Sequence, residues 1–204
     1  MTYSTAEIPT LHALVLAAGE SRRFGSPKQL VRLQGRPLLH LAVSRATEVA
    51  GQAVTVVLGA RAAELAPLLR HSSATIVVNR DWAEGIASSI RTGLAHVPPS
   101  CEGVLILLAD QAAVTAEDLR RLIAAWRRQS NCIAAAQYEM TTGVPAVFPR
   151  ADFPTLMALR GDQGARALLR HPNERIVRVP MAAAAIDIDT PEDLLHLESP
   201  SPQG

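Results

Sequence analysis

Aromatic residues and cysteines are scarce in this chain of 204 residues. Only 3% of the residues are aromatic, although 48% are hydrophobic. The core must therefore be aliphatic and rich in alanine, which suits helices packed on a Val/Ile/Leu sheet better than an aromatic-rich β-sandwich. The two cysteines, Cys101 and Cys132, are too few for a disulfide scaffold or a four-thiolate metal site.

The chain also lacks an excess of charge and any long apolar run. It has 20 Lys+Arg against 19 Asp+Glu, a net charge of +1, which excludes the strong basic field of a dedicated nucleic-acid binder but not a local basic patch. The longest apolar runs are strand-length, far short of the ~20 residues that cross a bilayer. Residues 1–10 have no basic segment typical of a signal peptide. With unpaired cysteines, these absences predict a cytoplasmic protein without nucleic-acid or membrane partners.

Short apolar runs alternate with helical patterns. Five runs are apolar on both faces and are predicted to be buried strands: residues 14–16, 54–58, 75–78, 104–108 and 132–136. Apolar residues recur at helical spacing within 39–46, 86–94 and 119–126. Thr115 and Asp118 predict a capping box for the last of these helices. This alternation predicts an α/β fold with three Rossmann-like layers and a mostly parallel, doubly wound sheet.

The order loosens after residue 137. Strands are predicted over 144–148 and 176–179 and helices near 153–159 and 165–169, which indicates a mixed or antiparallel edge. We find no linker or internal repeat. The expected organisation is an N-terminal extension (1–10), a single domain (11–197) and a disordered tail (198–204) that holds two Ser-Pro pairs.

The loop after the first predicted strand, residues 16–28, has the sequence LAAGESRRFGSPK. Ligands of open α/β sheets bind at the carboxyl ends of strands, and successive N–H groups in such a turn attract anions. Taken singly, Arg22 and Arg23 suit a solvated loop better. The pattern matches neither the Walker motif nor G-x-G-x-x-G. The full set nevertheless predicts a polyphosphate cradle of glycines, a hydroxyl and cations: Gly19, Gly25, Ser21, Arg22, Arg23 and Lys28.

The string LAAGxSxRFGxPK resembles the signature of the molybdopterin nucleotidyltransferases. Its Leu-Ala-Ala-Gly form is similar to the molybdenum cofactor cytidylyltransferases, whereas guanylyltransferases usually have Leu-Ala-Gly-Gly, so Ala18 favours CTP over GTP. The resemblance implies the fold of nucleotide-diphospho-sugar transferases. It also implies nucleotide-binding residues in this loop: Leu16, Ala17, Ala18, Gly19, Ser21, Arg23 and Lys28.

Two later segments extend the resemblance. In residues 79–89, Gly85 and Ser88 are implied to bind the nucleotide; ordinary capping by the serines, with Trp82 packing, is the alternative. Asp110 directly follows an apolar strand, where its charge needs a partner, and Mg²⁺ bound with substrate phosphates is a natural one. An aspartate that caps the strand–helix connection is the alternative. Members of the family usually have proline where this chain has Ala112.

The C-terminal part is similar to the acceptor side of the family. The implied acceptor-binding residues are Gly143, Pro145, Asp162 and Arg166; a turn with Asp162 as N-cap and Arg166 paired locally is the alternative. Four acids lie between residues 186 and 193. Glu192 and Asp193 suit a helix start, whereas the family match favours Asp189 as a second Mg²⁺ ligand beside Asp110, with Asp187 as the other choice.

The resemblance implies a Mg²⁺-dependent enzyme that transfers CMP from CTP to the phosphate of molybdopterin or molybdenum cofactor and releases pyrophosphate. Its catalytic residues would be Lys28, Arg23 and Asp110, and a molybdoenzyme would be its client. The six histidines are scattered, and a phosphate nucleophile needs no general base. Two alternatives stay open. One is a nucleotidyltransferase of the same fold acting on a sugar phosphate, methylerythritol phosphate or phospholactate; the other is a non-catalytic molybdopterin carrier or insertion factor.

Overall fold

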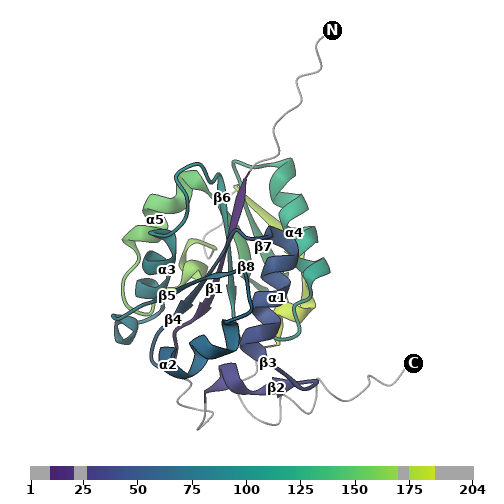
Figure 1. Ribbon diagram of the computed structural model, residues 1–204. Helices are drawn as coiled ribbons and strands as arrows, with labels where there is room; N and C mark the ends of the chain where they lie inside the picture. Colours follow the sequence, from purple (N-terminus) through teal and green to yellow (C-terminus); the bar gives the residue numbers. More distant parts are fainter. Residues whose placement is uncertain (1–9, 21–26, 170–174, 187–204) are drawn as a thin grey trace, which may run out of the picture.

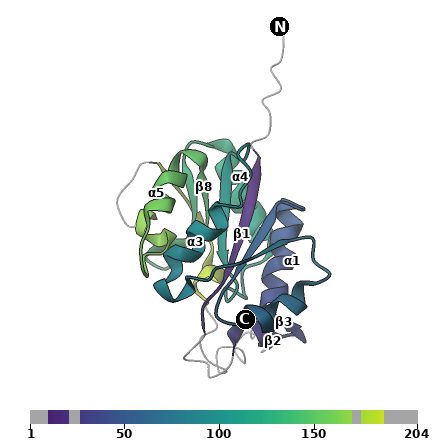
Figure 2. The same ribbon diagram turned by 60° about the vertical axis from the view of Figure 1, so that its left-hand side comes forward.

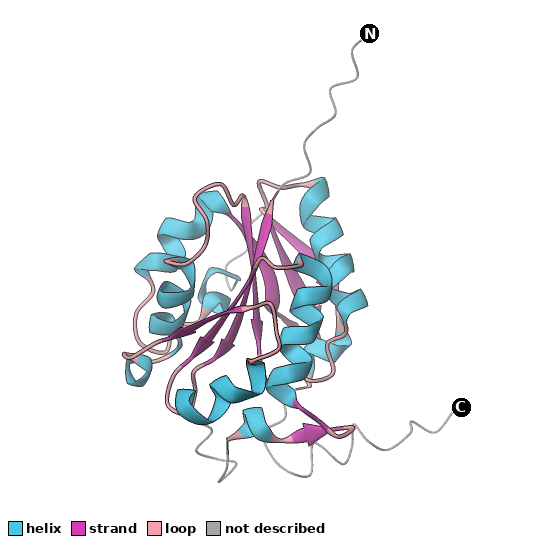
Figure 3. Ribbon diagram, viewed as in Figure 1, coloured by secondary structure: helices cyan, strands magenta, loops and turns pink. Residues whose placement is uncertain are grey.

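A seven-stranded sheet forms the middle layer of the protein (Figures 1 and 3). The computed structural model describes residues 10–20, 27–169 and 175–186. The strands, in their order across the sheet, are β5 (Thr75–Val78), β4 (Val54–Leu58), β1 (Leu11–Ala17), β6 (Gly103–Leu108), β8 (Thr141–Pro149), β7 (Ile133–Tyr138) and β9 (Ile176–Pro180). A separate two-stranded sheet pairs β2 (Arg32–Leu33) with β3 (Arg36–Pro37).

Helices cover both faces of the sheet. Figure 2 shows α1 (Leu38–Ala50) and α4 (Ala116–Arg128) on one face, and α3 (Ile86–Leu94) and α5 (Phe153–Ala158) on the other. The remaining helices are short: α2 (Ala62–Leu65), η2 (Lys28–Leu30), η3 (Ala66–Leu69), η4 (Trp82–Glu84), η5 (Arg150–Asp152), η6 (Ala165–Leu169) and η7 (Ala182–Ala185). The three layers confirm the predicted fold class. None of the helices in the described residues is long and apolar enough to cross a membrane.

The C-terminal strands form the mixed part of the sheet. Strand β8 is antiparallel to both β6 and β7, whereas the edge strand β9 is parallel to β7. Residues Glu139 and Met140 connect β7 to β8, and Glu139 has a positive φ of 50°. So short a connection can join only antiparallel strands. Strands β8, β7 and β9 thus make up the end of the sheet beyond β6, and the expectation of a mixed edge is confirmed.

The burial of strand β5 differs from the prediction. All four of its residues are β-branched and three are apolar. They were predicted to be buried on both faces, yet only Val77 is buried. Ile76 is 36% exposed and Val78 51% exposed, because β5 ends the sheet and pairs only with β4. An apolar run reveals a strand, but it does not distinguish a central strand from an edge strand.

The core is aliphatic, as the composition predicts. The two sheet faces bury alternate residues of β1, so that Ala13 and Val15 pack on one side and Leu14 on the other. Two fully buried aromatic side chains, Trp126 of α4 and Phe148 of β8, are the exceptions. The indole fits because Gly103 faces it; a Cβ on that glycine would lie 2.4 Å from the ring. The predicted capping box of Thr115 and Asp118 is confirmed at the start of α4.

A buried histidine makes the stability of this core depend on pH. His12 of β1 is 7% exposed, and its Nε2 lies 2.9 Å from Oγ1 of Thr55. Burial lowers the pKa of His12 below its usual 6.5. As the pH falls through about 6.5, the unfolded chain binds a proton that the folded protein does not, so the free energy of unfolding decreases.

We therefore expect the melting temperature to fall between about pH 7.5 and pH 5.5, and to fall less in His12→Gln. Thermal unfolding at both pH values, in both proteins, measures this difference. An equal loss in the wild type and the variant would show that His12 does not account for it.

Candidate active site

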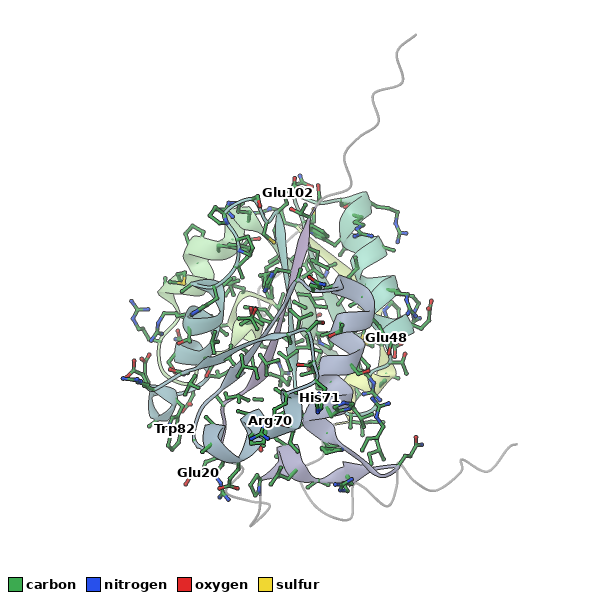
Figure 4. The ribbon with its side chains drawn as sticks, in the orientation of Figure 1. Glu20, Glu48, Arg70, His71, Trp82 and Glu102 are labelled. Atoms are coloured by element: carbon green, nitrogen blue, oxygen red, sulfur yellow. The ribbon has the colours of Figure 1, made fainter. Side chains whose placement is uncertain are left out.

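A cavity of about 490 Å³ opens at the carboxyl ends of β1 and β6. Residues 16–20, at the end of β1 and just after it, line the cavity together with residues 108–110, at the end of β6. Its far wall is formed by η4 and the first turns of α3. Figure 4 shows Glu20 and Trp82, which both line the cavity, at one end of the molecule, and Glu102, just before β6, at the other. The cavity therefore lies where ligands of open α/β sheets bind.

Hydrogen bonds from neighbouring segments hold the end of β1 and the turn that follows it in place. The carbonyl of Leu16 accepts a hydrogen bond from the amide of Ala109, and that of Ala18 accepts one from the amide of Ala60. The buried Gln29 donates through Nε2 to the carbonyls of Ala17 (3.4 Å) and Gly19 (3.1 Å). All four carbonyl oxygens of residues 16–19 thus accept bonds within the protein, so the turn is ordered before a ligand binds.

Lys28 and Asp110 meet in the cavity. Their Nζ and Oδ2 atoms are 3.1 Å apart, with side-chain exposures of 14% and 28%. Lys28 is the only lysine of the chain, since the other basic residues are all arginines. An ammonium is a compact point charge, suited to phosphate oxygens that approach from several directions. The pair thus places a cation and a carboxylate side by side at the carboxyl edge of the sheet.

The loop that carries Asp110 is anchored from two sides. Gln111 is buried, and its Nε2 donates to the carbonyl of Val144 in β8 (2.8 Å). From α1, Nη1 of Arg45 donates to the carbonyl of Ala112 (2.7 Å). These two bonds hold the loop in place.

The carboxylate of Asp110 suits a metal ion that binds together with the phosphates of a substrate. Within residues 10–20, 27–169 and 175–186, no group of three or more His, Cys, Asp or Glu side chains is placed to hold a metal ion. Mg²⁺ needs no such cage, because it keeps several waters and is usually bound by one or two carboxylates together with substrate phosphates. Asp187 and Asp189 lie outside the described residues, as do Ser21, Arg22, Arg23 and Gly25.

On the far wall, Ser89 lines the cavity in place of the predicted Ser88. Ser88 is buried behind the wall, where its Oγ lies within hydrogen-bond distance of two acceptors, the carbonyls of Asp81 (2.9 Å) and Gly85 (2.8 Å). Ser89 lines the cavity, and its Oγ accepts a hydrogen bond from Nδ2 of Asn79 (3.1 Å). Ser89 was missed in the sequence. Its position, three and four residues after the cavity residues Ile86 and Gly85, places it on the same helical face.

Of the four predicted acceptor residues, the structure brings only Asp162 to the cavity. Asp162 lies against Gly85, where a Cβ would be 2.5 Å from its Oδ1. Gly85 also has a φ of +119°, so both its conformation and this close approach require glycine. The other three lie on or beside β8: Gly143 packs under Tyr138, Pro145 lies near Gln111, and Arg166 donates to Oγ1 of Thr141 (2.9 Å).

Comparison with known proteins places this fold and cavity in one family. The family model of the MobA-like NTP transferase domain matches residues 13–177. The chain belongs to this family. The expectation of a nucleotidyltransferase is therefore confirmed at the level of the enzyme family.

Relatives of this MobA-like protein resemble it over nearly their whole length. Nicotine blue oxidoreductase of Paenarthrobacter nicotinovorans is 28% identical over 202 residues, covering 94% of this chain and 98% of the relative. Purine catabolism protein PucB of Bacillus subtilis (strain 168) is 28% identical over 198 residues, covering 91% and 94%.

Solved structures agree with these matches. The crystal structure of a homologue of Mycobacterium tuberculosis Rv0371c, from Mycobacterium sp. strain JC1, has a TM-score of 0.79 and 31% identity over 92% of this chain and 94% of that one. The complex of M. tuberculosis H37Rv Rv0371c with manganese has a TM-score of 0.77 and 27% identity, covering 92% and 97%.

Proposed function

We propose that this MobA-like protein transfers CMP from CTP to the phosphate of molybdopterin or molybdenum cofactor, with Mg²⁺, and releases pyrophosphate. The observation that carries the proposal is the contact of Lys28 with Asp110 beside residues 16–19. It joins a phosphate-binding cation, a carboxylate suited to a metal ion and the Leu-Ala-Ala-Gly turn in one cavity. We place the reaction in the cytoplasm, which the unpaired Cys101 and Cys132 favour.

In the proposed reaction, a phosphate oxygen of the acceptor attacks the α-phosphorus of CTP. One P–O bond forms, and the P–O bond to the leaving pyrophosphate breaks. The acceptor phosphate is ionised at neutral pH, so no side chain needs to remove a proton. Alignment and charge neutralisation are therefore the main contributions of the protein.

Each charged residue has a distinct role in this proposal. Lys28 would stabilise the negative charge of the leaving pyrophosphate, with Arg23 as a second cation. Asp110, with Asp189 as the second ligand, would hold Mg²⁺, which would supply neutralisation of the phosphate charge when bound. The manganese complex of Rv0371c supports a divalent metal in this family.

The proposed identities of the nucleotide base and of the acceptor depend on individual residues. Ala18 supports CTP over GTP through the resemblance of its turn to cytidylyltransferases, and Gly85 with Ser89 forms the wall on which we place the nucleotide. Asp162 would bind the acceptor. Gly143, Pro145 and Arg166, which flank this end of the sheet, would support the acceptor site. A molybdoenzyme would then receive the product.

A screen of pyrophosphate release tests the proposal. The purified protein is incubated with Mg²⁺ and either CTP or GTP, and with molybdopterin, a sugar phosphate, methylerythritol phosphate or phospholactate as acceptor. We expect release with CTP and molybdopterin, and slower release with GTP. Release only with another acceptor would move the protein to a different substrate within the same fold. Binding of molybdopterin without release under either triphosphate would identify a carrier instead of an enzyme.

A further inference from the structure

A turn from the C-terminal half of the chain closes the cavity at the start of α3. This turn, residues 159–162, follows α5, and Figures 1 and 2 both show α5 packed beside α3. The carbonyl of Gly161 accepts a hydrogen bond from the amide of Ala87, in the first turn of α3 (3.1 Å). The turn is thus attached to the segment that carries Gly85 and Ser89, although the two are far apart in the sequence.

Glu84 and Arg91 hold this junction together. Nη1 of Arg91 donates to the carbonyl of Leu159 (2.7 Å), and its Nη2 donates to Oε2 of Glu84. The other carboxylate oxygen of Glu84, Oε1, accepts from the amide of Gly161 (3.3 Å). We call these two side chains and their bonds to residues 159–161 the Glu84–Arg91 clamp.

The clamp is suited to fix geometry more than to add stability. Its side chains are 21% (Arg91) and 37% (Glu84) exposed, and ion pairs so open to water contribute little to the free energy of unfolding. The hydrogen bond from Arg91 lowers the pKa of Glu84, which keeps this carboxylate charged at neutral pH. The two Nη atoms of Arg91 donate to two different acceptors. Because the guanidinium is planar, these bonds fix both the distance and the direction of Glu84 relative to the carbonyl of Leu159.

The junction determines the position of Asp162 in the cavity. It directly follows Gly161, lines the same cavity as Lys28 and Asp110, and lies beside Gly85. A carboxylate repels phosphate groups but accepts hydrogen bonds from N–H donors. It therefore suits the part of an acceptor that carries ring N–H and amino groups, as a pterin does, and not its phosphate.

We infer that the Glu84–Arg91 clamp is a positioning device that fixes Asp162, and with it the acceptor-ring end of the cavity, relative to the nucleotide wall on α3. The identity of the acceptor rests on the proposed function; the mechanical role of the clamp does not. Neither Glu84 nor Arg91 lines the cavity. They act through the turn that they hold.

Kinetics of Arg91→Ala test the inference. Misplacement of a binding group by about 1 Å can cost up to about 100-fold, so we expect the KM for molybdopterin to rise about tenfold, while the KM for CTP changes less than about twofold. Arg91→Lys should recover only part of the loss, because one ammonium does not reproduce the planar fork that bridges Glu84 and Leu159. Arg120→Ala removes an exposed ion pair with Glu117 on α4 and should leave both KM values unchanged.

Amide hydrogen exchange supplies a readout that does not need the reaction. In Arg91→Ala and in Glu84→Gln, the amides of Gly161 and Ala87 should exchange faster than in the wild type, with unchanged rates in β1. Unchanged exchange at Gly161 would overturn the clamp, whether or not the enzyme turns over. In an active enzyme, an unchanged KM for molybdopterin, or equal rises for both substrates, would overturn its positioning role. A wild type inactive with every acceptor would instead overturn the proposed function.

Discussion

Asp110→Asn is expected to lower the rate of pyrophosphate release by about 1000-fold, while the fold is retained. The substitution keeps the size of the side chain and removes its charge, so the carboxylate proposed to bind Mg²⁺ with the triphosphate is lost. Asp110 is 28% exposed, and its loop is held independently by Gln111 and Arg45. The structure should therefore tolerate the change.

Steady-state kinetics over a range of Mg²⁺ concentrations, with melting curves, measure this effect. Glu117→Gln is the matched control, because it neutralises an exposed carboxylate on α4 and should leave turnover unchanged. Excess Mg²⁺ should restore little activity in Asp110→Asn, since the ligand itself is missing. Full activity in that variant would refute the assignment of Asp110 to the metal.

Lys28→Ala is expected to reduce kcat/KM for the triphosphate by about 100-fold or more, in line with the loss of a charge that stabilises the transition state. The variant also leaves Asp110 without the cation that lies 3.1 Å away. Lys28→Arg keeps the charge but changes its shape, so it should recover only part of the activity. Unchanged kinetics in Lys28→Ala would remove this residue from the phosphate site.

Because Lys28 is the only lysine of the chain, its contact with the triphosphate can be observed directly. Reductive methylation with ¹³C-formaldehyde labels its ammonium and the N-terminal amine, and the two signals separate by their pH dependence, because their usual pKa values differ by more than two units. Addition of Mg²⁺ and CTP should shift the lysine signal. In Asp110→Asn the signal of the free protein should already differ, since the ion pair is absent.

Much of the architecture could be predicted from local patterns. The apolar runs of β1, β4 and β6, the helical spacing of α3 and α4, and the capping box at Thr115 each depend on neighbours within a few residues. The loop of residues 16–28 is equally local, since its glycines, hydroxyl and cations are contiguous in the sequence. Backbone preference and the burial period act over this short range, so the sequence displays them without a tertiary structure.

Other features depend on which segments meet. The sequence marks Thr75–Val78 as a strand, but only the sheet order makes it an edge and leaves Val78 exposed. The tight connection at Glu139 and Met140 sends β8 back between β6 and β7. Ser88 and Ser89 are adjacent and chemically identical, and the packing of α3 alone decides which hydroxyl reaches the cavity.

The sequence by itself thus determined the α/β class and predicted a candidate site at the end of the first strand. Only the tertiary structure decided that Lys28 meets Asp110 across 82 positions of the chain, and that the Glu84–Arg91 clamp brings Asp162 to the same cavity. The reason is physical. Local patterns specify how each segment folds and which face it buries, whereas the pairing of distant segments follows from the order of strands and the packing of helices over the whole sheet.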